Sequence, residues 1–305
     1  MTHCGDANPP AIVADRFREA VRRSLEPARG TYIYDSVVRD VEDKTSPLDP
    51  CGYCKWLRGL LAYCSEALGV GSPKILDLGC GAGELTTIMN LLGYDAVGAD
   101  VSERALELAR ILADENHLSE NRILKIEGRH LPFNDDTFDI VVMISVLEHI
   151  DDEAMTWLVP ELKRVCRGIV FIQVPSSMKV SDDHTGLKFV PWLPHRIASF
   201  YVALRGKRYR YVISESKRWD VVHRNLDHIE RLFTNDFNMN IAPSRHSFPQ
   251  CVEQDAVLDI RKRIVIGPLS LPVCVPLPWR YLRKALGKRI EYFYPYYNLI
   301  FRRAG

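Results

Sequence analysis

The stretch from Lys74 to Thr86 constrains the fold of this chain more than any other. It begins with a short apolar run, continues with glycines at positions 79, 81 and 83, and then repeats apolar residues at helical spacing. A strand, a glycine turn and a helix in this order place bare backbone at a helix N-terminus, where a ligand can approach closely. Glycine suits such a turn because a Cβ would block the approach and the positive φ angles. The stretch predicts a ligand-binding turn; a glycine turn without a ligand is the alternative.

Strands and helices alternate from this stretch onward, which indicates an α/β fold with a doubly wound, mostly parallel sheet. Seven strands are expected, at residues 75–78, 95–100, 123–127, 138–146, 168–174, 237–241 and 297–302. The fourth is a continuous apolar run, as in a strand buried on both faces. Helices are expected at residues 11–25, 55–68, 84–92, 103–117, 151–165 and 226–235.

Two long insertions interrupt this pattern. They cover about residues 176–222, after the fifth strand, and about 244–295, between the last two strands, and both are too long for plain loops. We therefore divide the chain into a loosely packed N-terminal extension (1–54), a ligand-binding core (55–175), and the insertions together with the last strands (176–305). Substrate identity is expected to reside in the insertions, because shared folds are specialised by such segments.

Composition indicates an ordinary globular protein with an uneven charge. The chain has 305 residues, of which 47% are hydrophobic and 26% charged, with a net charge of +1. Residues 1–175 hold 18 basic and 28 acidic side chains, and residues 176–305 hold 22 and 11, so the two parts carry −10 and +11. The basic part either faces an anionic partner or solvates an outer face. No uncharged run approaches the roughly 18 residues that cross a bilayer, and we expect a cytoplasmic protein.

The carboxylates of Asp77 and Asp100 limit the class of ligand that the turn can bind. A dinucleotide-binding turn would place a third glycine where Glu84 stands, and that carboxylate would repel a pyrophosphate. Asp77, inside the first strand, suits a ligand with an ammonium group. Asp100 stands 21 positions after Gly79, at the tip of the second strand, where a carboxylate can accept hydrogen bonds from both hydroxyls of a ribose. An NAD(P)-dependent oxidoreductase remains as a weaker alternative.

Further motifs follow in a specific order. They are Leu131-Pro132-Phe133, Phe138-Asp139 and Leu147-Glu148-His149-Ile150. Together with Asp77, the three glycines and Asp100, they resemble the signatures of class I S-adenosylmethionine-dependent methyltransferases (type 11), in the group that includes the ubiquinone and menaquinone methylases. The resemblance covers about residues 70–175. It implies a Rossmann-like methyltransferase fold and S-adenosyl-L-methionine as cofactor.

The resemblance also implies roles for individual residues. The methionine end would lie at Asp77 and the turn, the ribose at Asp100, and the adenine beside Leu131 and Phe133, with an acidic contact that falls near Glu127. The expected cofactor-binding residues are Asp77, Gly79, Cys80, Gly81, Gly83, Asp100, Val101, Glu127, Leu131 and Ser145.

Methyl transfer to a hydroxyl needs a proton acceptor as well as alignment. His149 is the first candidate, because the end of the fourth strand faces the sulfonium in this fold; alternatively, it only positions the loop. His184, in the string Ser181-Asp182-Asp183-His184, is the second candidate, and a solvated turn explains that string nearly as well.

No metal is expected from the sequence. Some quinone O-methylating relatives hold a metal with two glutamates and the histidine of the last motif, but the first of those positions is Ser145 here. Glu148 and His149 alone make a poor site. Cys51 and Cys54 lack the second pair that a zinc site requires.

The insertions are aromatic and basic. Residues 189–208 have an apolar, helix-like centre and a cationic end, residues 267–279 are rich in proline, and residues 279–289 are amphipathic. Such mixtures occur at bilayer surfaces and also in lids. We expect a methyltransferase acting on a small-molecule or lipid-linked acceptor, at oxygen rather than carbon, with no nucleic-acid partner. Peripheral association with an anionic membrane is one interpretation of the insertions, and ordinary packing of a lid with a solvated face is the other. The rival is a non-catalytic protein that binds the cofactor without turnover.

Overall fold

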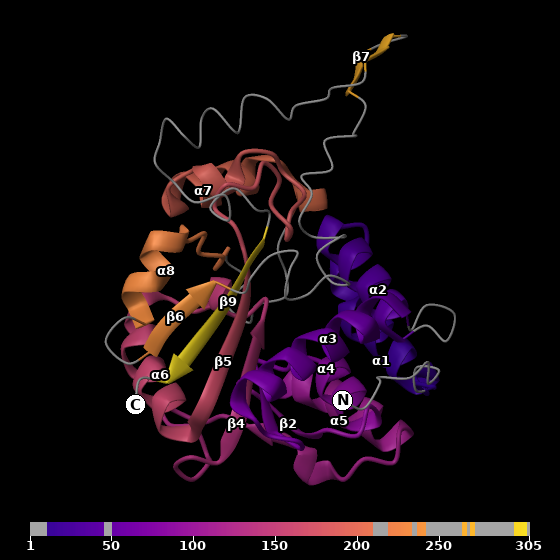
Figure 1. The fold of residues 1–305 in the computed structure, drawn as a ribbon. Coiled ribbons are helices and arrows are strands. Elements are labelled where there is room, and N and C mark those ends of the chain that lie inside the picture. The colour runs from indigo at the N-terminus through magenta and orange to yellow at the C-terminus, as the bar shows by residue number, and fades with distance from the viewer. Residues whose placement is uncertain are drawn as a thin grey trace.

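A computed structural model describes residues 11–45, 51–209, 219–233, 237–241, 264–266, 269–271 and 296–303 of the chain (Figure 1). The strands are β1 (Lys74–Leu78), β2 (Asp95–Asp100), β3 (Ile123–Lys125), β4 (Phe138–Ile144), β5 (Cys166–Pro175), β6 (Phe237–Ile241), β7 (Ile264–Ile266), β8 (Leu269–Leu271) and β9 (Tyr296–Arg303). The helices are α1 (Asp15–Leu25), α2 (Tyr32–Thr45), α3 (Cys51–Leu68), α4 (Glu84–Leu91), α5 (Glu103–Glu115), α6 (Asp152–Val165), α7 (His195–Leu204) and α8 (Leu226–Phe233).

Seven strands form the main sheet in the order β3-β2-β1-β4-β5-β9-β6, which confirms the predicted fold. The contacts of β1 with β2 and β4, and of β4 with β5, are parallel, whereas β9 runs antiparallel to both β5 and β6. β2 and β6 have the predicted bounds, and the other predicted strands of this sheet differ by a few residues at their ends.

Both faces of the sheet are covered, because the central strands are apolar on both sides. One face packs against α3 and α4 through residues such as Ile75 and Ile140. The opposite face packs against α6 and α8 through residues such as Leu76 and Val141. Figure 1 shows these helices on opposite sides of the strands.

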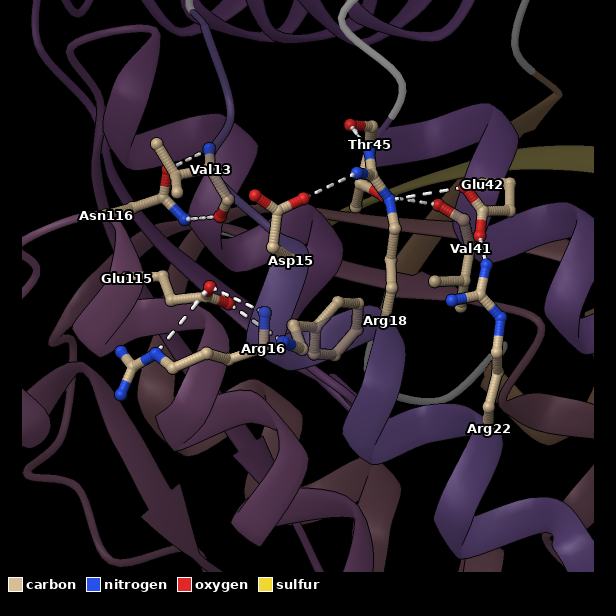
Figure 2. A network of polar contacts seen from close by, with 11 residues as sticks. Val13, Asp15, Arg16, Arg18, Arg22, Val41, Glu42, Thr45, Glu115 and Asn116 are labelled. Atoms are coloured by element: carbon tan, nitrogen blue, oxygen red, sulfur yellow. Dashed lines mark hydrogen bonds and ion pairs between the residues drawn. The ribbon is translucent and has the colours of Figure 1, made fainter.

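The N-terminal segment is more closely packed than its sequence predicted. Helix α1 has no side-chain cap of its own, and Glu115 of α5 accepts hydrogen bonds from the backbone N–H groups of Arg16 and Phe17 at 2.8 and 2.9 Å (Figure 2). Asn116 exchanges two hydrogen bonds with the backbone of Val13. The expectation of a loosely packed extension is therefore wrong for residues 11–45, while the domain boundary at residue 54 stays a prediction.

Helix α2, which the sequence analysis missed, joins this segment to the first insertion. Ile33 of α2 packs in one cluster with Val190, with Val202 of α7 and with Trp219. The Tyr32 ring lies so close to Gly186 that a Cβ there would come within 2.6 Å of it. The first insertion thus has a small core of its own, shared with α2.

Of the second insertion, the structure describes only β7 and β8, which pair antiparallel. The predicted proline-rich stretch lies largely outside the described residues, and the amphipathic stretch 279–289 lies entirely outside them. Among the described residues, no helix is both long and apolar enough to cross a membrane.

Candidate functional site

The turn between β1 and α4 is fixed by close packing at one of its glycines. Gly79 has φ +76°, and a Cβ at this position would lie 2.5 Å from Cγ2 of Val146, beyond the end of β4. Its N–H donates to the carbonyl of Ala99 on β2 at 2.7 Å. Only glycine allows the turn to approach both neighbouring strands this closely.

Gly81, in contrast to Gly79, has open surroundings. A Cβ built on it meets nothing within 4 Å, so bare backbone here borders open space. Its N–H donates to Oδ2 of Asp100 at 2.9 Å, while the N–H of Ser102 donates to Oδ1 at 2.9 Å. The carboxylate is therefore held by two backbone groups and still has lone pairs for further donors. Val101, next to it, is 67% exposed. Bare backbone, an oriented carboxylate and an apolar side chain thus lie close together.

Asp77 lies beneath this surface. Its side chain is buried and accepts a hydrogen bond from Oγ1 of Thr86 on α4 at 2.7 Å. Burial raises the pKa of this carboxyl to about 7, with Glu84 and Asp100 adding to the effect and the Thr86 hydroxyl opposing it. A contact between Asp77 and a ligand's ammonium group stays a prediction, and the structure places the carboxylate against α4.

The remaining predicted cofactor residues differ in accessibility. Cys80 is buried, and Leu131 is fully buried in the core that packs against α6. Glu127 follows β3 with its side chain 79% exposed, 3.7 Å from Nζ of Lys125. Ser145 is exposed at the end of β4 with φ +56°, a strained angle for a residue other than glycine. Contacts of these four residues with the cofactor therefore stay predictions.

Glu148 is the least expected feature of the region. It lies in the 3-10 helix η3 (Leu147–His149), and its side chain is 1% exposed. Neither carboxylate oxygen has a hydrogen-bond partner among the described residues. Burial raises the pKa of this carboxyl, and the nearby His149 and His184 offset part of that rise.

The two predicted catalytic histidines meet beside this carboxylate. Their rings are perpendicular, with centroids 5.0 Å apart, although the residues are 35 positions apart in the sequence. His149 follows β4, and His184 lies in a tight loop closed by the bridge between Ser181 and Lys188. One carboxylate oxygen of Glu148 and one nitrogen from each histidine all lie within 4.8 Å of one another.

Each histidine has a carboxylate behind it. Nδ1 of His149 lies 3.5 Å from Oδ1 of Asp220, and Nδ1 of His184 lies 3.6 Å from Oδ1 of Asp182. Burial lowers the pKa of His184, but the Asp182 carboxylate outweighs it, so the net shift is upward. The pKa of Asp182 is lowered in turn: burial acts against this shift, and His184 and His223 more than compensate.

The segment 219–225, at the end of the first insertion, holds these side chains in place. Arg224 is 3% exposed and donates to the carbonyl oxygens of Leu147 and Ile150 and to Oδ1 of Asp152. The N–H of Val222 donates to the carbonyl of Glu148 at 2.7 Å. Residues 219–225 are thereby fastened onto η3, which brings Asp220 to His149.

The structure therefore brings together His149, His184 and Glu148. The expectation of no metal, which rested on Glu148 and His149 lacking a third ligand, stays a prediction, and His184 lies beside these two residues. Sequence reasoning missed Asp220, His223 and Arg224, since they belong to no motif and follow the core by more than 40 residues. Asp182 could be noticed only as part of the acidic string before His184.

The comparisons with known proteins concern the core of the chain. Residues 75–168 match a family model described as a methyltransferase domain. A ubiquinone biosynthesis O-methyltransferase of Aliivibrio fischeri (strain MJ11) is 35% identical over 132 residues, which are 42% of this chain and 54% of that protein. A protein of the same description from Alkalilimnicola ehrlichii is 37% identical over 112 residues, 35% of this chain and 45% of that protein. The chain spans about half the length of the curated relatives it matches.

Two solved structures show looser likenesses. Magnesium protoporphyrin IX methyltransferase from Synechocystis PCC 6803 aligns over 95% of both chains, with 11% identity and a TM-score of 0.46. A SAM-dependent methyltransferase from Archaeoglobus fulgidus aligns over 81% of this chain and 90% of its own, with 14% identity and a TM-score of 0.42. With TM-scores below 0.5, neither likeness carries weight for the site.

Proposed function

We propose that this chain, whose residues 75–168 form a class I S-adenosylmethionine-dependent methyltransferase domain, transfers the methyl group of S-adenosylmethionine to an oxygen of a small-molecule or lipid-linked acceptor. The observation that carries the proposal is the pairing of Gly81 and Asp100. Bare backbone that borders open space is hydrogen-bonded there to a carboxylate that can still accept hydroxyl donors.

The residues present fit the cofactor. In this proposal, the methionine end lies along the backbone of Gly79 to Gly83, and Asp100 accepts hydrogen bonds from the two ribose hydroxyls. Val101, apolar and exposed beside Asp100, would pack against the adenine. Asp77 lies beneath the turn, so its carboxylate would attract the ammonium group of the cofactor across the turn. Glu127 and Leu131 would not contact the cofactor directly unless the loop after β3 moves. When bound, S-adenosylmethionine supplies a methyl group on a sulfonium, which is already activated for displacement.

The chain's own task is to align the acceptor, exclude water and remove a proton. Ser145, at the carboxyl end of β4, borders the place where the acceptor would meet the methyl group. His149 and His184 lie just beyond it, and a neutral imidazole can accept the proton of an acceptor hydroxyl. Asp220 and Asp182 would stabilise the imidazolium ions that result. Transfer to oxygen is further supported by the similarity of the core to ubiquinone biosynthesis O-methyltransferases.

Binding and turnover can be measured separately. Isothermal titration should show binding of S-adenosylmethionine and none of NAD(P), whereas the reverse result would support an oxidoreductase. Release of S-adenosylhomocysteine is then followed with fractionated metabolite and lipid extracts as acceptors. Tight cofactor binding without release on any extract would favour the non-catalytic rival.

Peripheral membrane binding is the second part of the proposal, and α7 supports it. Ile197, Phe200 and Leu204 are 53, 65 and 67% exposed and follow one another at helical spacing, while Ala198 and Val202 are buried on the opposite side. Phe189 and Trp192, just before the helix, are also exposed, and their ring centroids lie 5.2 Å apart. Figure 1 shows α7 far from α5, on the other side of the main sheet's strand ends.

The charge near α7 supports an anionic bilayer as the partner of this surface. Residues 188–209 contain five Lys and Arg and no Asp or Glu. Apolar and aromatic side chains with basic neighbours are typical of interfacial helices. Vesicles with anionic lipid should therefore carry the protein on flotation at low salt, and less of it at high salt. Phe200→Ser combined with Leu204→Ser should abolish this binding, whereas Val13→Ser, at an exposed apolar residue of the N-terminal segment, should not. Absence of flotation at low salt would contradict the proposal.

A further inference from the structure

We infer that Asp182 is a positioning residue, which holds His184 in the tautomer with the proton on Nδ1 and so leaves Nε2 as the nitrogen that removes the acceptor's proton. The inference rests on the proposed methyl transfer for the identity of that proton, whereas the tautomer is a property of the unliganded chain. A neutral imidazole carries a proton on one ring nitrogen and can accept one only at the other. The hydrogen-bond partner of one nitrogen therefore decides what the other nitrogen can do.

The two carboxylate oxygens of Asp182 have different partners. The side chain is 0% exposed, and Oδ2 accepts hydrogen bonds from the backbone N–H and from Oγ1 of Thr185 at 2.6 and 2.7 Å. Oδ1 lies 3.6 Å from Nδ1 of His184 and 3.2 Å from Nε2 of His223. Because Thr185 holds Oδ2, the carboxylate cannot rotate without losing two buried hydrogen bonds. Oδ1 is therefore kept directed at the two imidazoles.

The loop that carries Asp182 and His184 is tightly closed. The N–H of Gly186 donates to the carbonyl of Asp182 at 2.8 Å, and the N–H of Asp182 donates to the carbonyl of Leu187 at 2.9 Å. A distance of 3.6 Å between Asp182 and His184 is longer than a hydrogen bond, but catalytic hydrogen bonds are often long in an unliganded enzyme and shorten when the substrate binds. The closed loop keeps the two side chains in position for this change.

His149 has weaker support for the same task. Its side chain is 30% exposed and that of its partner Asp220 is 35% exposed, so water screens the pair. The side chain of His184 is only 13% exposed, and that of Asp182 is fully buried. Of the two proton acceptors in the proposed reaction, His184 is therefore the one whose tautomer the fold controls, and His149 is the one more open to solvent.

The charges around His184 agree with this role. Asp182 and Asp183 belong to its own loop, and Glu148 and His149 face it from η3. Burial lowers the pKa of His184, whereas Asp182, and after it Glu148 and Asp183, raise the pKa by more, so the net shift is upward. An imidazole with a raised pKa holds a transferred proton more firmly, once it has started from the neutral form.

The acceptor oxygen loses a proton and gains a methyl group in the proposed reaction. The oxygen forms a bond to the methyl carbon, while the S–CH3 bond breaks and its electron pair stays on the sulfur. The O–H bond of the acceptor also breaks, its electron pair stays on the oxygen, and the proton goes to Nε2 of His184. His184 becomes an imidazolium whose Nδ1–H is directed at Asp182, and this carboxylate stabilises the positive charge.

Nuclear magnetic resonance of the full chain labelled with ¹⁵N-histidine tests the tautomer directly, because protonated and unprotonated ring nitrogens differ in chemical shift. His184→Gln identifies the signals of His184 by their loss. Above the pKa of His184, we expect its proton on Nδ1 in the wild type. A wild-type His184 with its proton on Nε2 would overturn the inference. This readout needs no acceptor, so its failure is distinguished from failure of the proposed methyl transfer.

Asp182→Asn separates the two tasks of this side chain. The amide oxygen of asparagine can replace Oδ2 beside Thr185 and keep the loop closed. Its NH2 group then faces Nδ1 of His184 and donates to it, which moves the histidine proton to Nε2. We therefore expect the tautomer to change in this variant. A His184 that keeps its proton on Nδ1 in folded Asp182→Asn would contradict the role of Asp182, and the wild-type spectrum still decides the question if the variant folds poorly.

Asp183→Asn is the matched control. It removes the same charge from the neighbouring residue, whose carboxylate pairs with Lys179 and accepts a hydrogen bond from the hydroxyl of Tyr296 at 2.8 Å. His184 should keep its proton on Nδ1 in this variant, because Asp183 does not lie behind that nitrogen.

Turnover gives a second readout once the extracts yield an acceptor. Asp182→Asn should lower kcat by about 10²–10⁴-fold, the usual contribution of a general base, while its affinity for S-adenosylmethionine stays that of the wild type. Asp183→Asn should lower kcat by less than about tenfold, because the base keeps its tautomer. A wild-type kcat in Asp182→Asn, or equal losses in the two variants, would overturn the inference.

Discussion

The backbone N–H of Gly81 donates a hydrogen bond of 2.9 Å to Oδ2 of Asp100. This contact joins the turn after β1 to the tip of β2, at the carboxyl ends of two neighbouring parallel strands. In doubly wound sheets, ligands bind at this edge. The contact therefore places the backbone expected to hold an amino-acid moiety beside the carboxylate expected to hold a ribose.

Gly81→Ala tests whether the open space at this turn is occupied by the cofactor. The added Cβ meets no atom of the protein, but it enters the space that the ligand would fill. We expect the affinity for S-adenosylmethionine to fall at least about tenfold, equivalent to ~1.4 kcal/mol. Titration calorimetry measures this directly.

The matched control for that variant is Gly93→Ala. Gly93 also has a positive φ and open space around its missing Cβ, but it follows the other end of α4. Each substitution should cost roughly 1–2 kcal/mol of unfolding free energy, because alanine is strained in this conformation. Only Gly81→Ala should weaken the binding of S-adenosylmethionine. An equal loss of affinity in both variants would show that the effect comes from a disturbed fold and not from the occupied space at the turn.

Asp77 should make stability depend on pH. Its pKa is raised to about 7 in the folded chain, compared with ~3.9 for an unperturbed Asp. Between about pH 4 and pH 7 the folded chain retains a proton that the unfolded chain has lost, so the unfolding free energy falls as pH rises through this window, by at most ~1.4 kcal/mol per pH unit. Below the window this contribution to stability is fully present, and above it is lost.

Urea unfolding of wild type and Asp77→Asn at several pH values isolates this contribution. Asparagine can still accept the hydrogen bond from Thr86 but does not titrate, so the variant should gain stability relative to wild type as the pH rises from 5 to 8. A constant difference between the two proteins across this range would show that the Asp77 carboxyl does not titrate there.

Arg224 should be one of the most important single side chains for the order of the site. Arg224→Ala removes the guanidinium that donates to the carbonyls of Leu147 and Ile150 and pairs with Asp152, and we expect a loss of about 2–4 kcal/mol in unfolding free energy. The amide hydrogen of Val222, which forms a hydrogen bond to the backbone carbonyl of Glu148, should exchange with solvent faster in this variant. Hydrogen exchange and urea unfolding measure both effects.

Arg129→Ala is the comparison for this variant. Its guanidinium forms an exposed ion pair with Glu153, and such pairs contribute little to stability. If Arg224→Ala lowered the unfolding free energy as little as Arg129→Ala, and hydrogen exchange at the amide of Val222 were unchanged, the hydrogen bonds of Arg224 to η3 would have no structural role.

The sequence alone was sufficient to locate a strand or a helix where one physical signal dominates. Continuous apolar runs located β2 and β4, and Ser102 correctly predicted the start of α5. Helix α2 was missed because Tyr32, Ile33 and Val37 are aromatic or β-branched residues, which have low helix propensity. Its stability comes from packing against the first insertion, which no local pattern reveals.

The site was predicted in parts. His149 and His184 were each named from their own strings, but their contact depends on how the loop after β5 folds back over η3. Asp220 and Arg224 carry no local signal, because their roles are defined by partners more than 70 positions away. The buried state of Glu148 likewise depends on a segment from the insertion, and so its closeness to both histidines could not be anticipated.

Asp100→Ala gives the most direct test of the account. Asp95→Ala, at the exposed start of the same strand, is its control. Asp100→Ala should weaken binding of S-adenosylmethionine by at least about 100-fold, since two hydroxyl groups lose a charged acceptor, while Asp95→Ala should bind it as the wild type does. Unchanged affinity in a folded Asp100→Ala chain would contradict this expectation.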